Sequence, residues 1–457
     1  MIEHRSRGPL VASAIFLTVL LSAGIGAQAA GDVQAARAAV HPLRIDLGVT
    51  TTQPEPTSYC LKNYGFRCYD PAQLAKAYNL VGLHESGIDG SGRTIVIVDS
   101  FGSPTIKHDL RVFDQQFGLP DPPSFKIIQP AGAVPPFDPT NSDMTGWAGE
   151  TTLDVEWAHV FAPGAAIILV ETPVSETEGV QGFPEIVEAE NYVIDHGIGD
   201  VISQSFGATE ETFPNHQSIF ALRSAFENAA AHRVTVLGAS GDTGATDYEL
   251  NLIDLYPMRV NSWPSSDPLV TSVGGSHLTL DDAGNRLAPD VVWNDGFAAG
   301  GGGVSAVFSR PDFQDSVRAV VGSSRGTPDI SLSAACDGAV WVYSSYPSNP
   351  PTAGFGLVCG TSEATPEFAG IVAMADQVAG RRLGALGDSL YQLGRHSIVD
   401  ITMGNNTFGP FTNSDGNTYT VVGYPAGPGY DLASGLGTID AVKFVWALAE
   451  GGDDGDN

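Results

Sequence analysis

A serine at the start of an apolar helix is the residue best placed for chemistry in this chain. Residues 360–366 read Gly-Thr-Ser-Glu-Ala-Thr-Pro, and the apolar stretch 368–375 follows at once. A helix N-terminus presents unpaired backbone N–H groups and the positive end of the helix dipole, which stabilise a developing oxyanion. Ser362 is therefore a candidate nucleophile, although such a motif taken alone is more often an ordinary N-cap serine.

A nucleophilic serine needs a base, and none of the ten histidines lies in a motif typical of a catalytic histidine. His159, the histidine nearest to the acidic helix start at residues 149–158, is more typical of a packing or surface residue. That helix start offers Glu150 and Asp154, which are four residues apart and therefore share one helix face. Two carboxylates this close resist joint ionisation, so the pair can share a proton and supply a general base at acid pH. Taken alone, a solvated acidic helix start is the commoner explanation of this pattern.

A third carboxylate, Asp242, lies in the glycine-rich turn 238–244, directly after an apolar stretch. If that stretch is a strand, Asp242 lies at its carboxyl end. A protonated aspartate there can donate a hydrogen bond to an oxyanion. A plain turn aspartate between glycines is an equally good reading of this residue alone.

The elements that must position these residues alternate between strand and helix. Continuous apolar runs predict buried parallel strands, and amphipathic runs between them predict helices. The predicted strands are 94–98, 166–170, 201–203 and 234–237, and the clearest helices are 185–195 and 219–231. This alternation indicates a doubly wound α/β domain, in which sites gather at the carboxyl ends of the strands.

Composition limits the possible partners of the chain. The 457 residues are 42% hydrophobic and 16% charged, as in a globular protein, and the formal net charge is −30. So few basic residues argue against nucleic acid and against anionic membrane surfaces as partners. The acidic surface suits a protein that works at low pH, although solubility explains the charge equally well.

The N-terminal residues 1–29 resemble a secretory signal peptide. A basic start is followed by a short apolar run and by Ala27-Gln28-Ala29, a small-residue cleavage site; an uncleaved anchor is the less favoured alternative. Residues 30–57 are predicted to be a short flexible segment, residues 58–450 the folded domain and residues 451–457 an acidic tail. The four cysteines suit an exported protein, and of three possible connectivities we favour near neighbours, Cys60 with Cys68 and Cys336 with Cys359.

These motifs occur together in one known family. The chain resembles the sedolisins, or serine-carboxyl peptidases, in the order and context of Glu150-x-x-x-Asp154, Ser240-Gly241-Asp242-x-Gly244 and Gly360-Thr361-Ser362-x-x-x-Pro366. Further matches lie at residues 201–207, 263–268, 273–275, 301–305 and 325–331. Jointly these motifs are far more specific than any one of them, and the resemblance runs from roughly Asp70 to Trp446.

The resemblance implies a subtilisin-like fold and a role for each site residue. Ser362 would be the nucleophile, Glu150 the general base and acid, and Asp154 the residue that orients Glu150 and shares its proton. Asp242 would be a protonated oxyanion donor beside the backbone N–H of Ser362. Asp99 follows the first strand, where subtilisins keep their triad aspartate, and is expected to be structural or to face the substrate.

The resemblance also implies one structural calcium ion near the C-terminus. Asp400 and Asp431 would supply carboxylates, and Ile401, Gly427 and Gly429 would supply backbone carbonyls. Calcium takes several oxygen ligands of these two kinds. A pair of ordinary turn aspartates is the alternative.

We therefore expect a secreted, acid-acting endopeptidase that hydrolyses peptide bonds through an acyl-enzyme on Ser362. Its partners would be protein or peptide substrates, without nucleic acid or a membrane after signal cleavage, and it would act as a monomer. The alternatives are a tripeptidyl-peptidase, a non-catalytic binding protein on the same fold and a histidine-based subtilisin-like enzyme. Family members usually carry a long N-terminal propeptide, and the 30–57 segment is too short for one.

Overall fold

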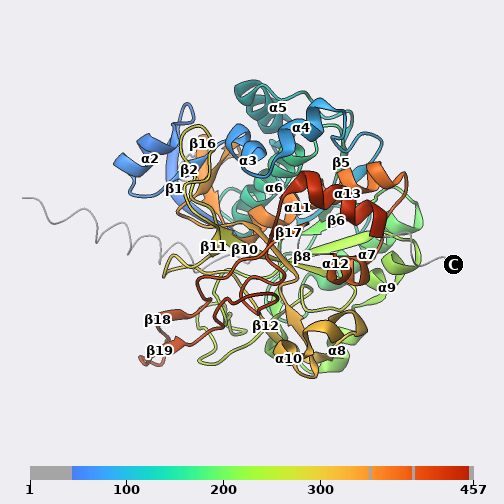
Figure 1. Cartoon of the computed structure of the whole chain (residues 1–457), viewed down its shortest axis with the longest axis vertical. Helices are drawn as coiled ribbons and strands as arrows, with labels where there is room; N and C mark the ends of the chain where they lie inside the picture. The colour runs from blue at the N-terminus through green and yellow to red at the C-terminus, as the bar shows by residue number, and fades with distance from the viewer. Residues whose placement is uncertain (1–43, 349–352, 394–396, 452–457) are drawn as a thin grey trace, which may run out of the picture. The chain divides into compact units, whose positions relative to one another are not determined.

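An eight-stranded, mostly parallel sheet forms the centre of the fold (Figure 1). The computed structural model describes residues 44–348, 353–393 and 397–451. The strand order is β11-β10-β8-β6-β3-β5-β4, and β14 pairs with β10. The strands are β3 (Thr94–Ser100), β4 (Phe125–Ile128), β5 (Ala166–Thr172), β6 (Val201–Gln204), β8 (Thr235–Ala239), β10 (Thr271–His277), β11 (Val291–Val292) and β14 (Ile330–Ser333).

Burial of both faces of the sheet explains its apolar strands. In β3, Ile95 and Ile97 belong to one apolar cluster, whereas Val96 and Val98 belong to another. Successive side chains of a strand point to opposite faces, so a strand covered on both sides must be apolar throughout. The four predicted strands are confirmed: each ends one to two residues later than predicted, and β8 also begins one residue later.

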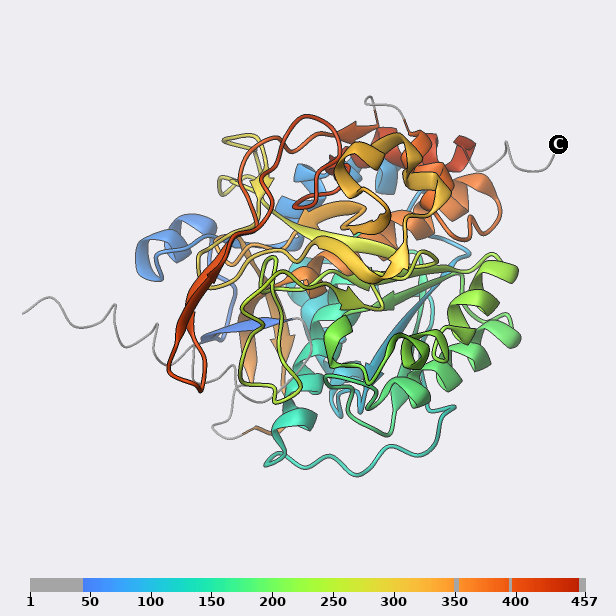
Figure 2. The ribbon, with the colours of Figure 1, turned by 90° about the horizontal axis from the view of Figure 1, so that it is seen from below.

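Helices cover the two faces of this sheet. The long helices α6 (Ser142–Phe161) and α11 (Thr361–Ala379) pack against each other and supply residues to the cluster that contains Ile95. The helices α7 (Phe183–Asp195) and α9 (Ser224–Ala231) supply residues to the other cluster, and Figure 2 shows them in green on one side of the sheet. The doubly wound α/β prediction is confirmed.

The predicted helix 219–231 is wrong in one respect, because it is interrupted. The chain forms α8 (His216–Phe220), turns, and resumes as α9. After the turn, the Arg223 guanidinium binds the Asp267 carboxylate, with Nε 2.6 Å from Oδ2. This long-range ion pair favours the interruption between α8 and α9, whereas local helix propensity favours one continuous helix.

A second sheet carries the described N-terminal residues. Its strand order is β1-β16-β15-β2, with β1 (Ile45–Thr51) antiparallel to β16 (Gly354–Cys359). The other two strands are β15 (Ala339–Ser344) and β2 (Cys68–Tyr69). The prediction of a flexible segment at 30–57 is therefore wrong for residues 45–51, because their backbone groups pair with β16, about 300 residues away in the sequence. The predicted signal peptide lies outside the described residues.

Two disulfide bonds secure this region of the fold. Cys60 joins Cys68, and Cys336 joins Cys359 at the end of β16, next to α11. The near-neighbour pairing predicted from the sequence is confirmed. The cross-link between Cys336 and Cys359 restrains the chain directly before the nucleophile motif.

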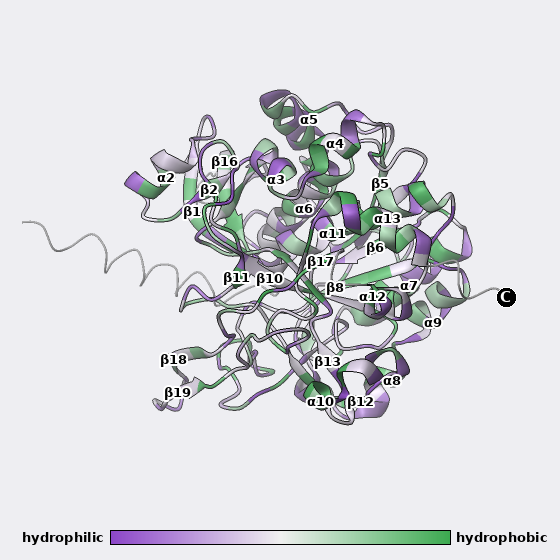
Figure 3. Cartoon of the chain, viewed as in Figure 1, coloured by the Kyte–Doolittle hydropathy of each residue, from purple (hydrophilic) through white to green (hydrophobic). Residues whose placement is uncertain are grey.

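The remaining helices and strands complete the fold around these two sheets. The helices are α2 (Thr57–Asn63), α3 (Pro71–Ala77), α4 (Leu80–Glu85), α5 (Ile106–Phe117), α10 (Arg318–Val321), α12 (Gly387–Gln392) and α13 (Ala441–Gly451). Small two-stranded sheets pair β7 (Ala208–Thr209) with β9 (Ser262–Trp263), β12 (Gly303–Ser309) with β13 (Ser324–Thr327), β17 (Ile398–Val399) with β20 (Thr438–Ile439) and β18 (Phe408–Thr412) with β19 (Thr418–Val421). Figure 3 shows helices such as α5 with both apolar and polar residues. In the part of the chain that the structure describes, no helix is long and apolar enough to span a membrane.

Candidate active site

The nucleophile candidate lies in the first turn of α11, as its motif predicts. Strand β16 leads into Gly360, whose φ of 132° lies in a region that favours glycine, and the helix begins at the next residue. Ser362 is 0% exposed, and its hydroxyl lies 3.4 Å from the carbonyl oxygen of Ser205. The turn thus holds a serine hydroxyl at a helix N-terminus inside the protein.

The carboxylate pair lies on the neighbouring helix α6, which packs against α11. Glu150 and Asp154 are both 0% exposed, so the surface reading of this helix start is wrong. The Ser362 hydroxyl is close enough to Glu150 to lower the pKa of its carboxyl. Among the residues that the structure describes, neither carboxylate oxygen of Glu150 has a hydrogen-bond partner of ordinary geometry, and Arg44 Nε lies 3.8 Å from Oε2. In a free enzyme such catalytic contacts are often long and shorten when substrate binds.

Asp154 is held by the strand beside it. Ser205, directly after β6, donates a hydrogen bond from Oγ to Asp154 Oδ1 at 2.8 Å. The same residue's carbonyl faces the Ser362 hydroxyl. Ser205 therefore links Asp154 to Ser362 from the carboxyl end of β6.

Burial controls the protonation of this carboxylate group. It raises the pKa of Glu150 well above its ordinary value, an effect that Arg44 opposes most strongly and that Asp99 and Asp242 reinforce. Burial also raises the pKa of Asp154 well above its usual range, with further contributions from the charges of Asp99 and Glu150. Adjacent buried carboxyls cannot all ionise together, so the cluster retains protons at pH values where exposed carboxylates are ionised.

Asp99 belongs to the same cluster. It is 0% exposed in β3, and burial raises its pKa to about 7. Its charge raises the pKa of both Glu150 and Asp154. The sequence placed Asp99 at the carboxyl end of the first strand, and the structure adds its electrostatic link to the pair.

Asp242 approaches the nucleophile motif from the loop after β8. Its Oδ1 accepts hydrogen bonds from the backbone N–H of Thr361 at 2.8 Å and from the Thr361 hydroxyl at 2.9 Å. Asp242 is 8% exposed. The loop after β8 thus places a third carboxyl next to the N-terminus of α11.

The histidine nearest in sequence to the carboxylate pair takes no part in this group. His159 is buried on α6, and its Nε2 lies 2.7 Å from the carbonyl of Pro120 and 3.5 Å from Asp114 Oδ1. Burial lowers the pKa of His159 to about 4. Of the two roles predicted for His159, packing or surface, the structure shows the packing role.

The structure adds residues that sequence reasoning missed. Thr361 binds Asp242, and Arg44 is the charged neighbour of Glu150. Glu363 and Glu367, on the same helix as Ser362, are 0% exposed, and burial raises the pKa of both. Their spacing of four residues resembles that of Glu150 and Asp154, a signal that the sequence did contain.

Comparisons with known proteins agree with this geometry. A model of the subtilase family, Peptidase_S8, matches residues 142–409, a range that contains all four predicted catalytic residues. The chain belongs to the subtilase family. It is 32% identical over 397 residues to kumamolisin from Bacillus sp. (strain MN-32), covering 83% of this chain and 63% of kumamolisin. It is 28% identical over 387 residues to sedolisin from Pseudomonas sp. (strain 101), covering 82% of this chain and 60% of sedolisin.

A solved structure supports the sedolisin branch of this family. The structure of Pseudomonas sedolisin, a serine-carboxyl proteinase complexed with two molecules of pseudo-iodotyrostatin, superposes with a TM-score of 0.70 at 27% identity. The superposition covers 85% of this chain and 99% of that chain. Together with the relatives above, it places this subtilase in the sedolisin family, with the subtilisin-like fold. The chain spans about three fifths of the length of kumamolisin and sedolisin.

The predicted calcium ligands lie around one loop. Asp431 Oδ2 accepts a hydrogen bond from the backbone N–H of Gly427 at 2.9 Å. Asp400 Oδ2 accepts one from the N–H of Gly429 at 2.8 Å. Ile401, next to Asp400, is buried. Among the residues that the structure describes, no group of three or more His, Cys, Asp or Glu side chains could hold a metal ion.

Proposed function

We propose that this subtilase is an acid-acting serine-carboxyl endopeptidase. One observation carries the proposal: Ser362, Glu150 and Asp242 come together from three separate segments of the chain. Asp154, one helical turn after Glu150, interacts with it by charge and accepts a hydrogen bond from Ser205. All four side chains are buried, and each has a role that peptide hydrolysis requires. A non-catalytic binding protein would have no need for this arrangement.

The reaction follows from these positions. The Ser362 oxygen attacks the peptide carbonyl while Glu150 takes the proton of the Ser362 hydroxyl. Asp154 stabilises the protonated pair by sharing this proton with Glu150. The oxyanion accepts hydrogen bonds from protonated Asp242 and from the N-terminus of α11. Glu150 then gives the proton to the leaving amine, which leaves an ester on Ser362. Water, activated by Glu150, hydrolyses this ester and restores the serine.

Hydrolysis of a denatured protein is expected to peak at acid pH. The base, Glu150, must be ionised, whereas Asp242 must keep its proton to donate a hydrogen bond. Activity should therefore fall on the acid side as Glu150 gains a proton and on the alkaline side as Asp242 loses one. The test is the pH dependence of kcat/KM from pH 2 to 9. A maximum at neutral or alkaline pH would contradict the proposal and favour a histidine-based enzyme.

A peptide with a free or a blocked N-terminus distinguishes endopeptidase from tripeptidyl-peptidase activity. Mouse tripeptidyl-peptidase 1 is 31% identical over 259 residues, which cover 51% of this chain. An endopeptidase cleaves an N-acetylated peptide and its free form at similar rates. An enzyme that releases tripeptides requires the free amino group, so acetylation would block it.

We also propose that Asp400, Asp431 and the carbonyls of Ile401, Gly427 and Gly429 hold a structural calcium ion. Support comes from the two carboxylates, which lie against one loop, and from a donor set made of oxygen alone. The bound ion would join residues 400–401 to residues 427–431.

Removal of calcium is expected to lower thermal stability. A ligand that binds only the folded state stabilises it by about 2.7 kcal/mol at a hundredfold excess over its Kd. Chelation should therefore lower the Tm by several degrees, and added calcium should restore it. The Asp431→Asn variant should lose most of this response. An equal Tm with and without chelator in the original protein would refute the site.

We further propose that the protein is secreted and acts on proteins or peptides as a monomer. The two disulfides are typical of an oxidising compartment, and residues 1–29 have the pattern of a signal peptide. The acidic composition suits work at low pH.

A further inference from the structure

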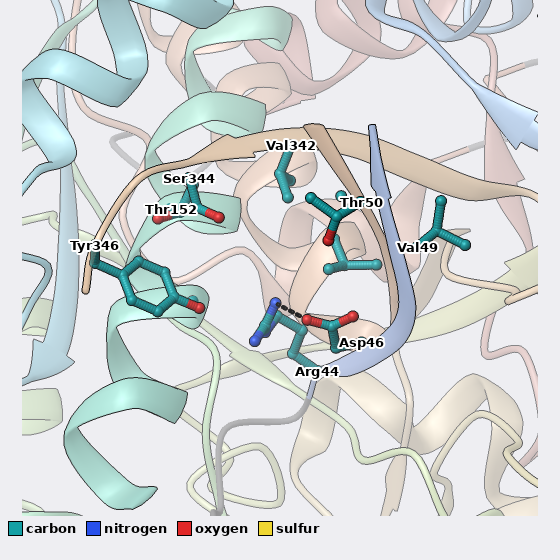
Figure 4. A pocket seen from close by; sticks show the side chains of 11 residues that line it. Arg44, Asp46, Val49, Thr50, Thr152, Val342, Ser344 and Tyr346 are labelled. Carbon is teal, nitrogen blue, oxygen red and sulfur yellow. Dashed lines mark ion pairs between the residues drawn. The ribbon is translucent and has the colours of Figure 1, made fainter. Parts of the chain in front are cut away.

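A cation from the N-terminal strand lies beside the candidate general base. Arg44, directly before β1, has its Nε 3.8 Å from Glu150 Oε2, and its side chain is 10% exposed. Figure 4 shows its guanidinium between Asp46 and Tyr346, in a pocket formed by β1, β15, β16 and α6. The contact joins two parts of the chain that are 106 residues apart, and the pairing of β1 with β16 holds it in place.

The helix that carries Glu150 makes room for this guanidinium. A Cβ atom at Gly149 would lie 2.2 Å from Arg44 Nη2. The absent side chain therefore creates the space in which the guanidinium rests against α6. The contact depends on a glycine directly before the base.

Among the described side chains that shift the pKa of Glu150, Arg44 is the cation. The others are the carboxyls of Asp99 from β3 and Asp242 from the loop after β8, and the Ser362 hydroxyl from α11. On α6 itself, Asp154 is the neighbouring carboxyl, and its pKa too is lowered by Arg44. Arg44 also contacts Asp46 and the Tyr346 hydroxyl. The Asp46 side chain is 53% exposed, and its Oδ2 lies 3.9 Å from Arg44 Nη1.

We propose that Arg44 is a positioning residue for the reaction, which acts as the counter-ion of Glu150 and keeps this base ionised at acid pH. Glu150 is buried among carboxyl groups, and both its burial and their charges favour its neutral form. A neutral Glu150 cannot accept the proton of Ser362. An adjacent guanidinium, which stays charged at any pH of interest, stabilises the carboxylate and leaves the shared proton to Asp154. This inference rests on the proposed role of Glu150 as the base.

The test is the pH profile of kcat/KM for Arg44→Gln, with Arg44→Lys as the charge-conserving partner. An opposite charge within 4–6 Å lowers a carboxyl pKa by about 1–3 units, so loss of the charge should move the acid limb upward by about 1 unit or more. At a pH on that limb, kcat/KM then falls at least about tenfold. The alkaline limb should stay in place, and Arg44→Lys should retain most of the original profile.

Two further variants keep the test independent of folding defects in β1. Gly149→Ala displaces the guanidinium without changing Arg44, and it should move the acid limb in the same direction. Thr51→Ala alters the other end of β1, where the Thr51 hydroxyl donates a hydrogen bond to the Gln53 carbonyl, and it should leave the acid limb unmoved. Melting temperatures of all variants show which of them are folded.

The outcomes separate this inference from the proposed function. If Glu150→Gln is inactive and neither Arg44→Gln nor Gly149→Ala moves the acid limb, Arg44 is not the counter-ion. If Arg44→Gln instead raises activity at every pH with a lower KM, Arg44 obstructs substrate, and the proposal is overturned. If Glu150→Gln remains active, the assignment of the base itself fails.

Discussion

Replacing Ser362 by alanine is expected to abolish peptide-bond hydrolysis and to leave the fold intact. In the proposed mechanism the hydroxyl oxygen of Ser362 is the atom that bonds to the substrate carbonyl, and alanine carries no group that can replace it. Loss of a nucleophile of this kind lowers kcat by a factor on the order of a million. The hydrogen bond that this hydroxyl donates to the Ser205 carbonyl is long, 3.4 Å, so the loss of this bond should lower the free energy of unfolding only slightly.

The matched control is Ser331→Ala in β14. Ser331 is also 0% exposed, and its hydroxyl donates a 3.1 Å hydrogen bond to the carbonyl of Ser434. It should retain nearly full activity, with a Tm close to that of the original protein. Both variants are assayed on denatured protein at acid pH after equal purification. Residual hydrolysis by Ser362→Ala at the original rate would rule out this serine and favour a binding protein contaminated by another protease.

The sheet was predictable because its strands are buried on both faces. Runs such as 95–98 and 166–170 are apolar without interruption, and their short length and β-branched residues favour a buried strand over a helix. Helix ends were less predictable where a tertiary contact decides them, as between α8 and α9, where Arg223 binds Asp267. Strand β1 was missed although Ile45, Leu47 and Val49 alternate with exposed residues, a pattern typical of a strand. The local pattern does not indicate its partner β16, which is about 300 residues away in the sequence.

The sequence allowed the candidate site residues to be named, but it did not predict their burial or their contacts. Glu150, Asp154 and Asp242 each had an ordinary explanation, and only their joint order along the chain outweighed it. The structure supplies what spacing could not, which is the total burial of the pair on α6 and the bond from Thr361 to Asp242. Arg44 shows the limit of sequence reasoning most clearly. Its contact with Glu150 requires β1, an unexpected strand, and the space left by Gly149.

Replacing Asp242 by alanine is expected to lower kcat by about a hundredfold to a thousandfold, with a smaller change in KM. An oxyanion donor acts mainly in the transition state, and loss of one such donor has an effect of this size. The geometry supports this role, since Asp242 binds the residue directly before Ser362 from the end of β8. The measurement is the separate determination of kcat and KM for one peptide across the acid range.

The control for this substitution is Asp376→Ala, at the other end of α11. Asp376 is also a buried carboxylate that accepts a backbone hydrogen bond, from Leu383 N–H at 2.9 Å. It follows Ser362 by 14 positions in the helix, which corresponds to about 21 Å along the axis. Its loss should lower the Tm while kcat of the folded enzyme stays near the original value. If both variants lose kcat equally, Asp242 acts through the stability of α11 rather than on the oxyanion. If only Asp242→Ala loses kcat, while KM and the Tm change little, the donor role is the explanation that remains.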